Sequence, residues 1–221
     1  MVNTAEPGTG NKTPRTWRIV GGVCAAVLAI LVSGFVLWPV TPRDLGAGNQ
    51  MQQANVYHHW QGGDVIVLVR HAERCDRSAN PCLGPADGIT QLGSHSASDL
   101  GQAFRTLGMA TTDVISSPAT RTRQTSEFMF TGAVQTQDWL ATCDKHFQQT
   151  IKAHKSPKRN LILITHSDCI SNLERQLGYP HALASEYTSS LFVTLDPQGR
   201  MQVLGIMGAG AWQRVLGQPL E

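Results

Sequence analysis

The sequence predicts an α/β fold: a mainly parallel sheet with helices on both faces, preceded by one N-terminal transmembrane helix. Two continuous apolar runs, at residues 64–70 and 160–165, are typical of strands that are buried on both faces. A helix is predicted at residues 90–107, where Thr90 can cap the first turn and Gly108 ends the segment. Because strands and helices alternate along the chain, most strands are expected to run parallel.

Shorter patterns give the remaining elements of this alternation. Strands are predicted at residues 113–116, around Val134, at 190–195 and at 201–206. The last two are joined by the strong turn signal DPQG at residues 196–199. Further helices are predicted at residues 121–130, 144–154 and 169–177.

The N-terminal region predicts a membrane anchor. Residues 1–18 form a polar tail, and residues 19–38 carry no formal charge over twenty positions, enough for one helical span. Lys12, Arg15 and Arg18 precede this segment, so the positive-inside rule places the tail in the cytoplasm. We therefore expect a single-pass inner-membrane protein whose remaining chain lies in the periplasm, with a cleaved signal peptide as the alternative.

The rest of the chain is expected to hold a polar linker at residues 39–61 and one domain at residues 62–221. The formal net charge of +2 gives no footprint for nucleic-acid binding, so no such partner is expected. Neighbouring His58 and His59 do not have the spacing of zinc ligands. No metal and no cofactor are therefore predicted.

Four of the five cysteines, Cys75, Cys82, Cys143 and Cys169, lie in the part expected to be exported. In an oxidising compartment this even number favours two disulfides, of which three connectivities are possible. Cys75–Cys82 with Cys143–Cys169 is the favoured pairing, because the first pair closes a short loop. Free buried thiols are the alternative.

Three predicted strands lead into residues suited to bind phosphate. The first strand runs into Arg70 and His71, the second is followed by Arg121, and another ends at His166. Sites in open parallel sheets form beyond the carboxyl ends of the strands, so these side chains are expected to meet. A neutral imidazole can attack phosphorus, guanidinium binds phosphate oxygens bidentately, and a second histidine can neutralise another oxygen as imidazolium. The pattern predicts a phosphoryl-transfer site.

The same segments resemble the histidine phosphatase superfamily, in its phosphoglycerate-mutase-like branch. Residues 69–73 (VRHAE) resemble that family's R-H-G/A-E signature, and residues 116–121 (SSPATR), followed by Gln124 and Thr125, resemble its second arginine segment. Residues 164–166 (ITH) resemble its second histidine segment, and residues 88–90 (GIT), followed by Gly93, resemble its helix start. The resemblance covers about residues 62–195.

This resemblance implies a role for each matching side chain. His71 is expected to be the nucleophile that forms a phosphohistidine, and Arg70, Arg121 and His166 are expected to bind the phosphoryl group. Arg77, six residues after the nucleophile, and more weakly Arg74 are assigned to substrate binding, with a solvated loop as the alternative.

The chain departs from the family at the proton donor, normally a Glu in a Leu-x-Glu segment after the third strand. Residues 139–142 read WLAT, so that carboxylate is missing. Asp168 is ranked first as its replacement because it follows His166 by two residues. Asp144, which can equally be an N-cap, and Asp138 are the alternatives. A substrate with a good leaving group, such as a phosphohistidine, needs no donor.

A narrower resemblance involves residues 70–78 (RHAERCDRS), then Asn80, Cys82 and residues 88–90, which are similar to the lipopolysaccharide core heptose(II)-phosphate phosphatases. Those are exported enzymes with an N-terminal hydrophobic segment, and the positions of Cys143 and Cys169 also match, which supports two disulfides. The implied substrate is a phosphate on heptose of the lipopolysaccharide core. A phosphohistidine or small phosphomonoester phosphatase and a non-catalytic anion-binding module are the alternatives.

Overall fold

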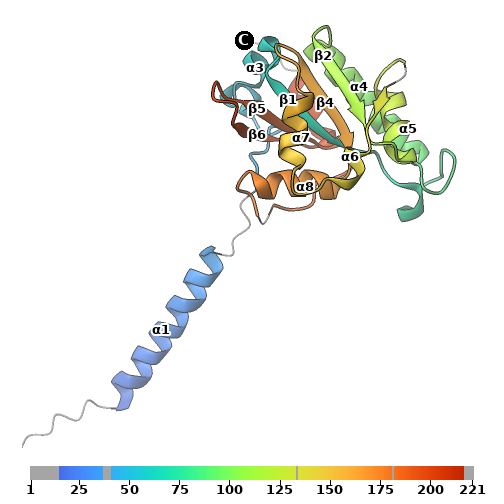
Figure 1. Cartoon of the computed structure of the whole chain (residues 1–221). Helices are drawn as coiled ribbons and strands as arrows, with labels where there is room; N and C mark the ends of the chain where they lie inside the picture. Colours follow the sequence, from blue (N-terminus) through green and yellow to red (C-terminus); the bar gives the residue numbers. More distant parts are fainter. Residues whose placement is uncertain (1–14, 37–40, 133, 181, 217–221) are drawn as a thin grey trace, which may run out of the picture. The chain divides into compact units, whose positions relative to one another are not determined.

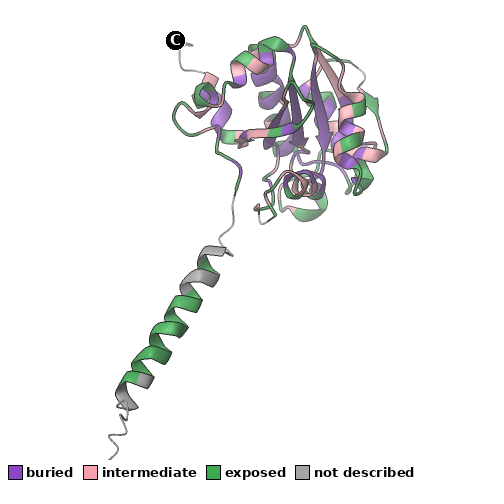
Figure 2. Ribbon diagram, turned by 60° about the vertical axis from the view of Figure 1, so that its left-hand side comes forward, coloured by how far each residue is buried: buried purple, intermediate pink, exposed green. Residues whose placement is uncertain are grey.

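The computed structural model describes residues 15–36, 41–132, 134–180 and 182–216, in two separate units. The first unit contains helix α1 (Arg15–Val36), whose described apolar side chains, such as Ile19, Val23 and Ile30, are exposed (Figure 2). None of the helices in the described residues is both long and apolar enough to cross a membrane. The anchor predicted at residues 19–38 is therefore not confirmed, and its last two positions lie outside the described residues.

The second unit, Pro39–Glu221, is built on a six-stranded sheet with the strand order β3-β2-β4-β1-β5-β6 (Figure 1). Strands β1 (Val65–Arg70), β2 (Thr112–Ser116), β3 (Gln135–Thr136) and β4 (Asn160–Thr165) run parallel. Strands β5 (Ser190–Leu195) and β6 (Met201–Met207) form an antiparallel hairpin beside β1. The prediction of a mainly parallel sheet is confirmed, including the hairpin joined at residues 196–200.

The two central strands are apolar throughout because both of their faces are covered. Along β1, Val65, Val67 and Val69 belong to the core on one face, whereas Ile66 and Leu68 belong to the core on the other. All five side chains are fully buried. The alternation of side chains along a strand supplies both cores from one short run.

One core lies beneath α2 (Gln50–Gln53), α3 (Val56–Gly62), α4 (Gln91–Leu107), α5 (Thr120–Met129) and α9 (Trp212–Leu216). Its centre is an aromatic cluster in which the Phe104 ring lies 5.8 Å from that of Trp60 and 5.3 Å from that of Trp212. The other face is covered by α6 (Trp139–Thr142), α7 (Phe147–His154) and α8 (Ser167–Gln176) (Figure 1). Two short 3₁₀ helices, Cys75–Arg77 and Ala209–Ala211, complete the unit.

Residues 41–61 differ from the predicted linker, since they belong to the folded unit. Leu45, Met51, Val56 and Trp60 are all buried in the core that α4 covers. The surrounding residues are polar and the helices α2 and α3 are short, so no sustained period reveals this burial. The domain therefore includes the segment that the sequence assigns to a linker.

Other boundaries agree closely with the predicted ones. Thr90 caps α4 by accepting a hydrogen bond from the Gly93 N–H at 2.9 Å, and Gly108 ends that helix with a positive φ of 96°, which favours glycine. The third strand, predicted around Val134, comprises Gln135–Thr136, and α6 is an additional single-turn helix that the sequence pattern does not predict. A single turn contains too few residues to show a helical period.

The favoured disulfide pairing, Cys75–Cys82 and Cys143–Cys169, is confirmed. The first disulfide closes the loop after β1, and the second connects the end of α6 to α8. Cys24 of α1 is an exposed free thiol.

Candidate phosphoryl-transfer site

The site lies where the carboxyl ends of β1, β2 and β4 meet. The His71 N–H donates to the Thr165 carbonyl at 3.0 Å, and the Ser117 N–H donates to the Ile164 carbonyl at 2.9 Å. These bonds bring the two predicted histidines together, with 5.4 Å between the ring centroids of His71 and His166. The predicted convergence of the three strand ends is thus observed.

The His71 imidazole is held in one tautomer. Its Nδ1 lies 2.8 Å from the Ala72 carbonyl oxygen, which can only accept, so Nδ1 carries the proton and Nε2 keeps a free lone pair. The Ala72 N–H in turn donates to Thr125 Oγ1 at 2.9 Å, which fixes this turn to α5. Burial, together with the positive charges of Arg121 and Arg70, lowers the pKa of His71 to about 3. His71 is therefore a neutral imidazole at physiological pH.

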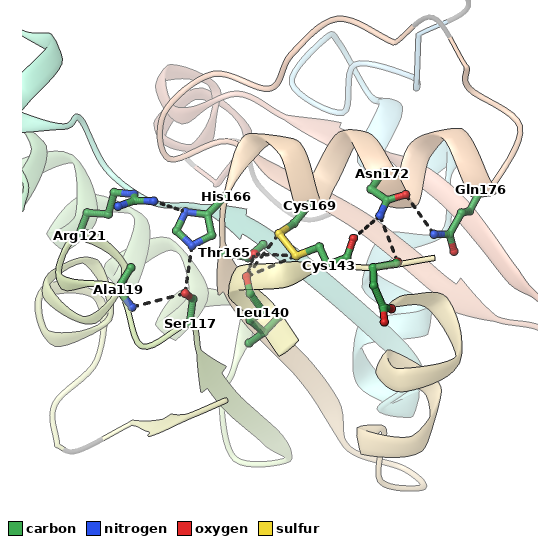
Figure 3. The surroundings of a disulfide bond; sticks show 11 residues. Ser117, Ala119, Arg121, Leu140, Cys143, Thr165, His166, Cys169, Asn172 and Gln176 are labelled. Atoms are coloured by element: carbon green, nitrogen blue, oxygen red, sulfur yellow. Dashed lines mark hydrogen bonds between the residues drawn. A yellow bond between two sulfur atoms is a disulfide. The ribbon is translucent and has the colours of Figure 1, made fainter. Parts of the chain in front are cut away.

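The His166 imidazole is also neutral, and both of its nitrogens are occupied (Figure 3). An Arg121 guanidinium nitrogen lies 3.1 Å from Nδ1, and because guanidinium can only donate, Nδ1 must be unprotonated. Nε2 then donates to Ser117 Oγ at 3.0 Å. Burial and the Arg121 charge lower the pKa of His166 to about 4. His166 was expected to bind phosphate as an imidazolium, but in the free protein it is neutral. The guanidinium groups of Arg70 and Arg121 supply the positive charge instead.

Arg70 and Arg121 keep their charges available for an anion. Within the described residues neither forms an ion pair with a carboxylate, and the Nε atoms of both are buried without a hydrogen-bond partner. Burial lowers the pKa of each guanidinium, but a group of this basicity stays charged at neutral pH. The described residues contain no group of three His, Cys, Asp or Glu that could hold a metal ion.

Glu73 organises the loop that follows the nucleophile. Its carboxylate accepts hydrogen bonds from Thr90 Oγ1 at 2.7 Å, Asn80 Nδ2 at 2.9 Å and Ser78 Oγ at 3.0 Å. These bonds, that of Thr90 above all, lower the pKa of Glu73. Glu73 therefore connects the start of α4 to the loop closed by the Cys75–Cys82 disulfide.

The two predicted substrate-binding arginines lie in this loop. Arg74 is paired with Asp76, with 2.8 Å between Nε and Oδ1. Arg77 is exposed, and its charge is close enough to lower the pKa of Arg70. Both arginines therefore stand at the rim of the site, where Arg74 is partly neutralised in the free protein.

The three predicted proton donors lie in different surroundings. Asp168 is exposed in the first turn of α8, and its carboxylate partly offsets the lowering of the pKa values of Arg70, Arg121 and His166. Asp144 instead accepts a hydrogen bond from the His146 N–H at 2.8 Å in an Asx turn, and the N-cap residue of α7 is His146. Asp138 lies at the start of α6. The geometry favours Asp168 over the other two.

Three further residues contact the site, and their contacts were not predicted. Ser117 binds His166, Thr125 fixes the turn at Ala72, and the ring of Tyr187 lies 4.0 Å from the Arg70 Cζ atom. Ser117 and Thr125 lie in the second arginine segment, so its pattern could have pointed to them. Tyr187 lies in a loop before β5, and no sequence pattern marks it.

No protein-family model matches the chain. The chain is similar to a lipopolysaccharide core heptose(II)-phosphate phosphatase of Escherichia fergusonii, with 38% identity over 120 residues. This match covers 50% of the chain and 58% of the relative. A phosphatase of the same name from Escherichia coli O139:H28 is 38% identical over 114 residues, which cover 50% of the chain and 56% of the relative. The chain thus spans little more than half the length of these curated relatives.

Solved structures with a similar fold extend over more of the chain. The protein histidine phosphatase SixA, complexed with tungstate, matches with a TM-score of 0.54 and 17% identity over 66% of this chain and 97% of that protein. This likeness in fold agrees with the predicted resemblance to histidine phosphatases. A phosphoserine phosphatase from Entamoeba histolytica, in complex with 3-phosphoglyceric acid, matches with a TM-score of 0.50 and 12% identity. That match covers 64% of this chain and 95% of that protein, and at such identity these likenesses concern the fold of histidine phosphatases alone.

Proposed function

We propose that the chain is a phosphoric monoester hydrolase in which His71 is the nucleophile. The single observation that carries this proposal is the state of His71: a buried, neutral imidazole with a free Nε2, beside two guanidinium groups without carboxylate partners. A neutral nucleophile next to uncompensated positive charge is the arrangement that phosphoryl transfer needs.

In the proposed reaction, His71 Nε2 attacks phosphorus and the bond between phosphorus and the leaving oxygen breaks. Arg70 and Arg121 bind the equatorial phosphoryl oxygens, and His166 is oriented by Ser117. Asp168, as the carboxylic acid, gives its proton to the leaving oxygen. Water then attacks the phosphohistidine, the carboxylate of Asp168 takes the proton from that water, and phosphate leaves with His71 restored.

The first test is replacement of the nucleophile. His71→Ala should lower phosphate release from para-nitrophenyl phosphate by at least about a thousandfold, because it removes the imidazole that forms the proposed covalent intermediate. Wild-type protein should release phosphate in the presence of EDTA and yield an acid-labile phosphoryl group on His71 after rapid quenching. The exposed His95→Ala is the matched control. If His71→Ala turns over substrate as fast as the unmodified chain, this mechanism is excluded. If the unmodified chain binds phosphate but releases none from its esters, the result supports an anion-binding module instead.

The proposed substrate is a phosphate on heptose of the lipopolysaccharide core. The support is the similarity to phosphatases of that name and the loop with half-buried Arg74 and exposed Arg77, which suits a substrate carrying several negative charges. Release of phosphate from purified core oligosaccharide, with loss of the corresponding mass in the core of cells that express the protein, is the expected result. Unchanged core mass in those cells would exclude this substrate.

A phosphohistidine phosphatase is the second candidate, and one specific observation favours it. Helix α6, which follows β3, carries no carboxylate, and phosphohistidine is a leaving group that needs no proton donor. Asp168→Asn separates the candidates. In rapid-quench experiments it should slow formation of the phosphoenzyme from a sugar phosphate on the order of 10²-fold but leave its formation from a phosphohistidine peptide nearly unchanged, since only the first of these leaving groups needs a proton.

For the location, we propose that residues 19–38 anchor the chain in the inner membrane, with residues 1–18 in the cytoplasm and the domain in the periplasm. The charge-free segment after Lys12, Arg15 and Arg18 supports this orientation. The two disulfides suit an oxidising compartment. Protease added to spheroplasts should digest the domain, and alkaline carbonate should leave the full chain in the membrane pellet. Recovery in the cytosolic fraction, protected from protease, would contradict the proposed location.

A further inference from the structure

The Arg70 guanidinium is held in the site by an aromatic ring. One guanidinium nitrogen donates to the Ser185 carbonyl, and the Cζ atom lies 4.0 Å from the centroid of the Tyr187 ring. A cation at this distance over a ring is attracted by the ring's quadrupole. Neither the carbonyl nor the ring carries a formal negative charge. Arg70 is therefore oriented without being neutralised.

The loop that carries Tyr187 is fixed to the same strand as the nucleophile. The Thr188 N–H donates to the Arg70 carbonyl at 3.2 Å, and the Arg70 N–H donates to the Ser189 carbonyl at 3.0 Å. Ser185, Thr188 and Ser189 are buried, with 2–3% of their surface exposed. Tyr187 therefore has a defined place between buried neighbours, although it lies in a loop.

The position of the Tyr187 ring also concerns the nucleophile. Its centroid lies 5.7 Å from that of the His71 ring, with 47° between the ring planes. Tyr187 also lies near enough to Arg74, at the rim of the site, to help raise the pKa of that guanidinium. The ring thus stands between Arg70, the nucleophile and the rim of the phosphate site.

We propose that Tyr187 is a positioning residue for the phosphoryl group: its ring holds the Arg70 guanidinium in place for the phosphate oxygens and leaves the full charge available. A carboxylate in the same place would orient Arg70 equally well, but it would repel a phosphate dianion and weaken its binding. The proposal rests on the proposed function, because it assigns Arg70 to the phosphate.

The experiment compares Tyr187→Phe with Tyr187→Leu in the full chain. Binding of inorganic phosphate and of vanadate is measured by calorimetry, and kcat and KM are measured with para-nitrophenyl phosphate. Tyr187→Leu should weaken phosphate binding and lower kcat/KM by about tenfold, the range of a partly buried cation–π contact. Tyr187→Phe retains the ring and should lose less than about threefold. Tyr179→Leu, at a half-buried tyrosine that lines a different hollow, is the matched control.

A double-mutant cycle distinguishes positioning from a general structural effect. If the ring acts through the guanidinium, Tyr187→Leu should have almost no further effect on phosphate binding once Arg70 is changed to Gln. Equal phosphate affinity of wild type and Tyr187→Leu would overturn the proposal, as would a loss in Tyr187→Phe as large as that in Tyr187→Leu. A wild-type chain that binds phosphate without turnover would contradict the proposed function but leave the Tyr187 comparison intact. A wild-type chain that binds neither phosphate nor vanadate would exclude both.

Discussion

At the scale of single residues, the protonation of His71 and His166 is determined by one hydrogen-bond partner each. The Ala72 carbonyl can only accept and the Arg121 guanidinium can only donate, so His71 is protonated on Nδ1 and His166 on Nε2. The nucleophile is consequently ready at neutral pH without a general base. Positive charge for the phosphate comes from arginine, whose charge does not depend on pH in this range.

Ser117→Ala tests the orientation of His166. The substitution removes the acceptor 3.0 Å from His166 Nε2 and leaves a buried donor unsatisfied, which costs about 1–3 kcal/mol. We expect kcat to fall by roughly tenfold to a hundredfold, if that cost falls on the transition state. Ser116→Ala is the control, since the buried Ser116 hydroxyl bonds the Ser117 carbonyl and no histidine. Equal kcat values for the two variants would show that Ser117 does not position His166.

Asp76→Asn tests whether Arg74 takes part in substrate binding. In the free protein Arg74 is paired with Asp76 at the rim of the site, and because the Asp76 carboxylate faces solvent the pair is only weakly held. Loss of the carboxylate should free Arg74 for the phosphorylated substrate and lower KM by up to about fivefold, an effect that decreases with added salt. Asp196→Asn, which breaks the remote pair with Arg200, should leave KM unchanged. An increased KM in Asp76→Asn would indicate that the pair itself shapes the site.

The sequence predicts the site residues that lie at the carboxyl ends of strands. Arg70, His71 and His166 follow directly from β1 and β4, and a parallel sheet brings such ends together. Tyr187 could not be predicted in this way, because its contact with Arg70 joins positions separated by more than a hundred residues through an irregular loop. Likewise, the protonation of His166 depends on the orientation of Arg121, which no spacing along the chain encodes.

At the scale of elements, a disulfide and hydrogen bonds connect α6 to α8 near His166 (Figure 3). The Cys143–Cys169 disulfide connects them, Asn172 donates to the Cys143 and Asp144 carbonyls, and Thr165 Oγ1 donates to the Leu140 carbonyl at 2.8 Å. Cys169 follows His166 by three residues, so this connection also fixes the start of α8. The short α6 therefore acts as a support for the site, although it carries no carboxylate of its own.

Removal of each disulfide should have a different effect. The double variant Cys143→Ser with Cys169→Ser removes a cross-link between positions 26 residues apart, so it should lower the free energy of unfolding by about 2–4 kcal/mol. It should also reduce kcat, because His166 is then less well fixed. Cys75→Ser with Cys82→Ser releases the loop that carries Arg74 and Arg77, so it should mainly raise KM. Urea unfolding and steady-state kinetics check both pairs. The same change in KM and kcat for both pairs would contradict the separate roles.

The elements that the sequence predicted well are those with a sustained pattern. The apolar run of β4 and the capped α4 have the predicted ends within one residue. The segment before β1 resembles a linker in sequence because its buried residues, Leu45, Met51, Val56 and Trp60, are spaced irregularly among polar neighbours. Their burial depends on the aromatic cluster around Phe104, which only the folded chain brings together.

At the scale of the whole molecule, buried titratable groups make stability depend on pH in two opposite directions. Burial lowers the pKa values of His71 and His166 from 6.5 to about 3 and about 4. Below pH 6.5 the unfolded chain therefore binds more protons than the folded chain, and stability decreases as the pH falls through this window. Glu174 has the opposite effect, because burial raises the pKa of its carboxyl group from 4.5 to about 7.

Glu174→Gln separates these two contributions. The Glu174 side chain is 1% exposed, and neither carboxyl oxygen has a hydrogen-bond partner in the described part of the chain. Between pH 4.5 and about 7, Glu174 holds a proton in the folded chain that the unfolded chain has lost. The contribution of the neutral carboxyl group to the free energy of unfolding is therefore fully present below pH 4.5, and it is lost as the pH rises through about 7. Glutamine is neutral throughout this range.

The variant should therefore match the wild type near pH 5 and exceed its free energy of unfolding at pH 8 by roughly 1–3 kcal/mol, because only the wild type must ionise a buried carboxyl group over this range. Urea unfolding at both pH values measures this difference, with the exposed Glu127→Gln as the control. Since the two histidines are unchanged, both proteins should still lose stability equally below pH 5. An effect of the same size at pH 5 and pH 8 would mean that Glu174 acts through packing and that its ionisation does not limit the stability of the domain.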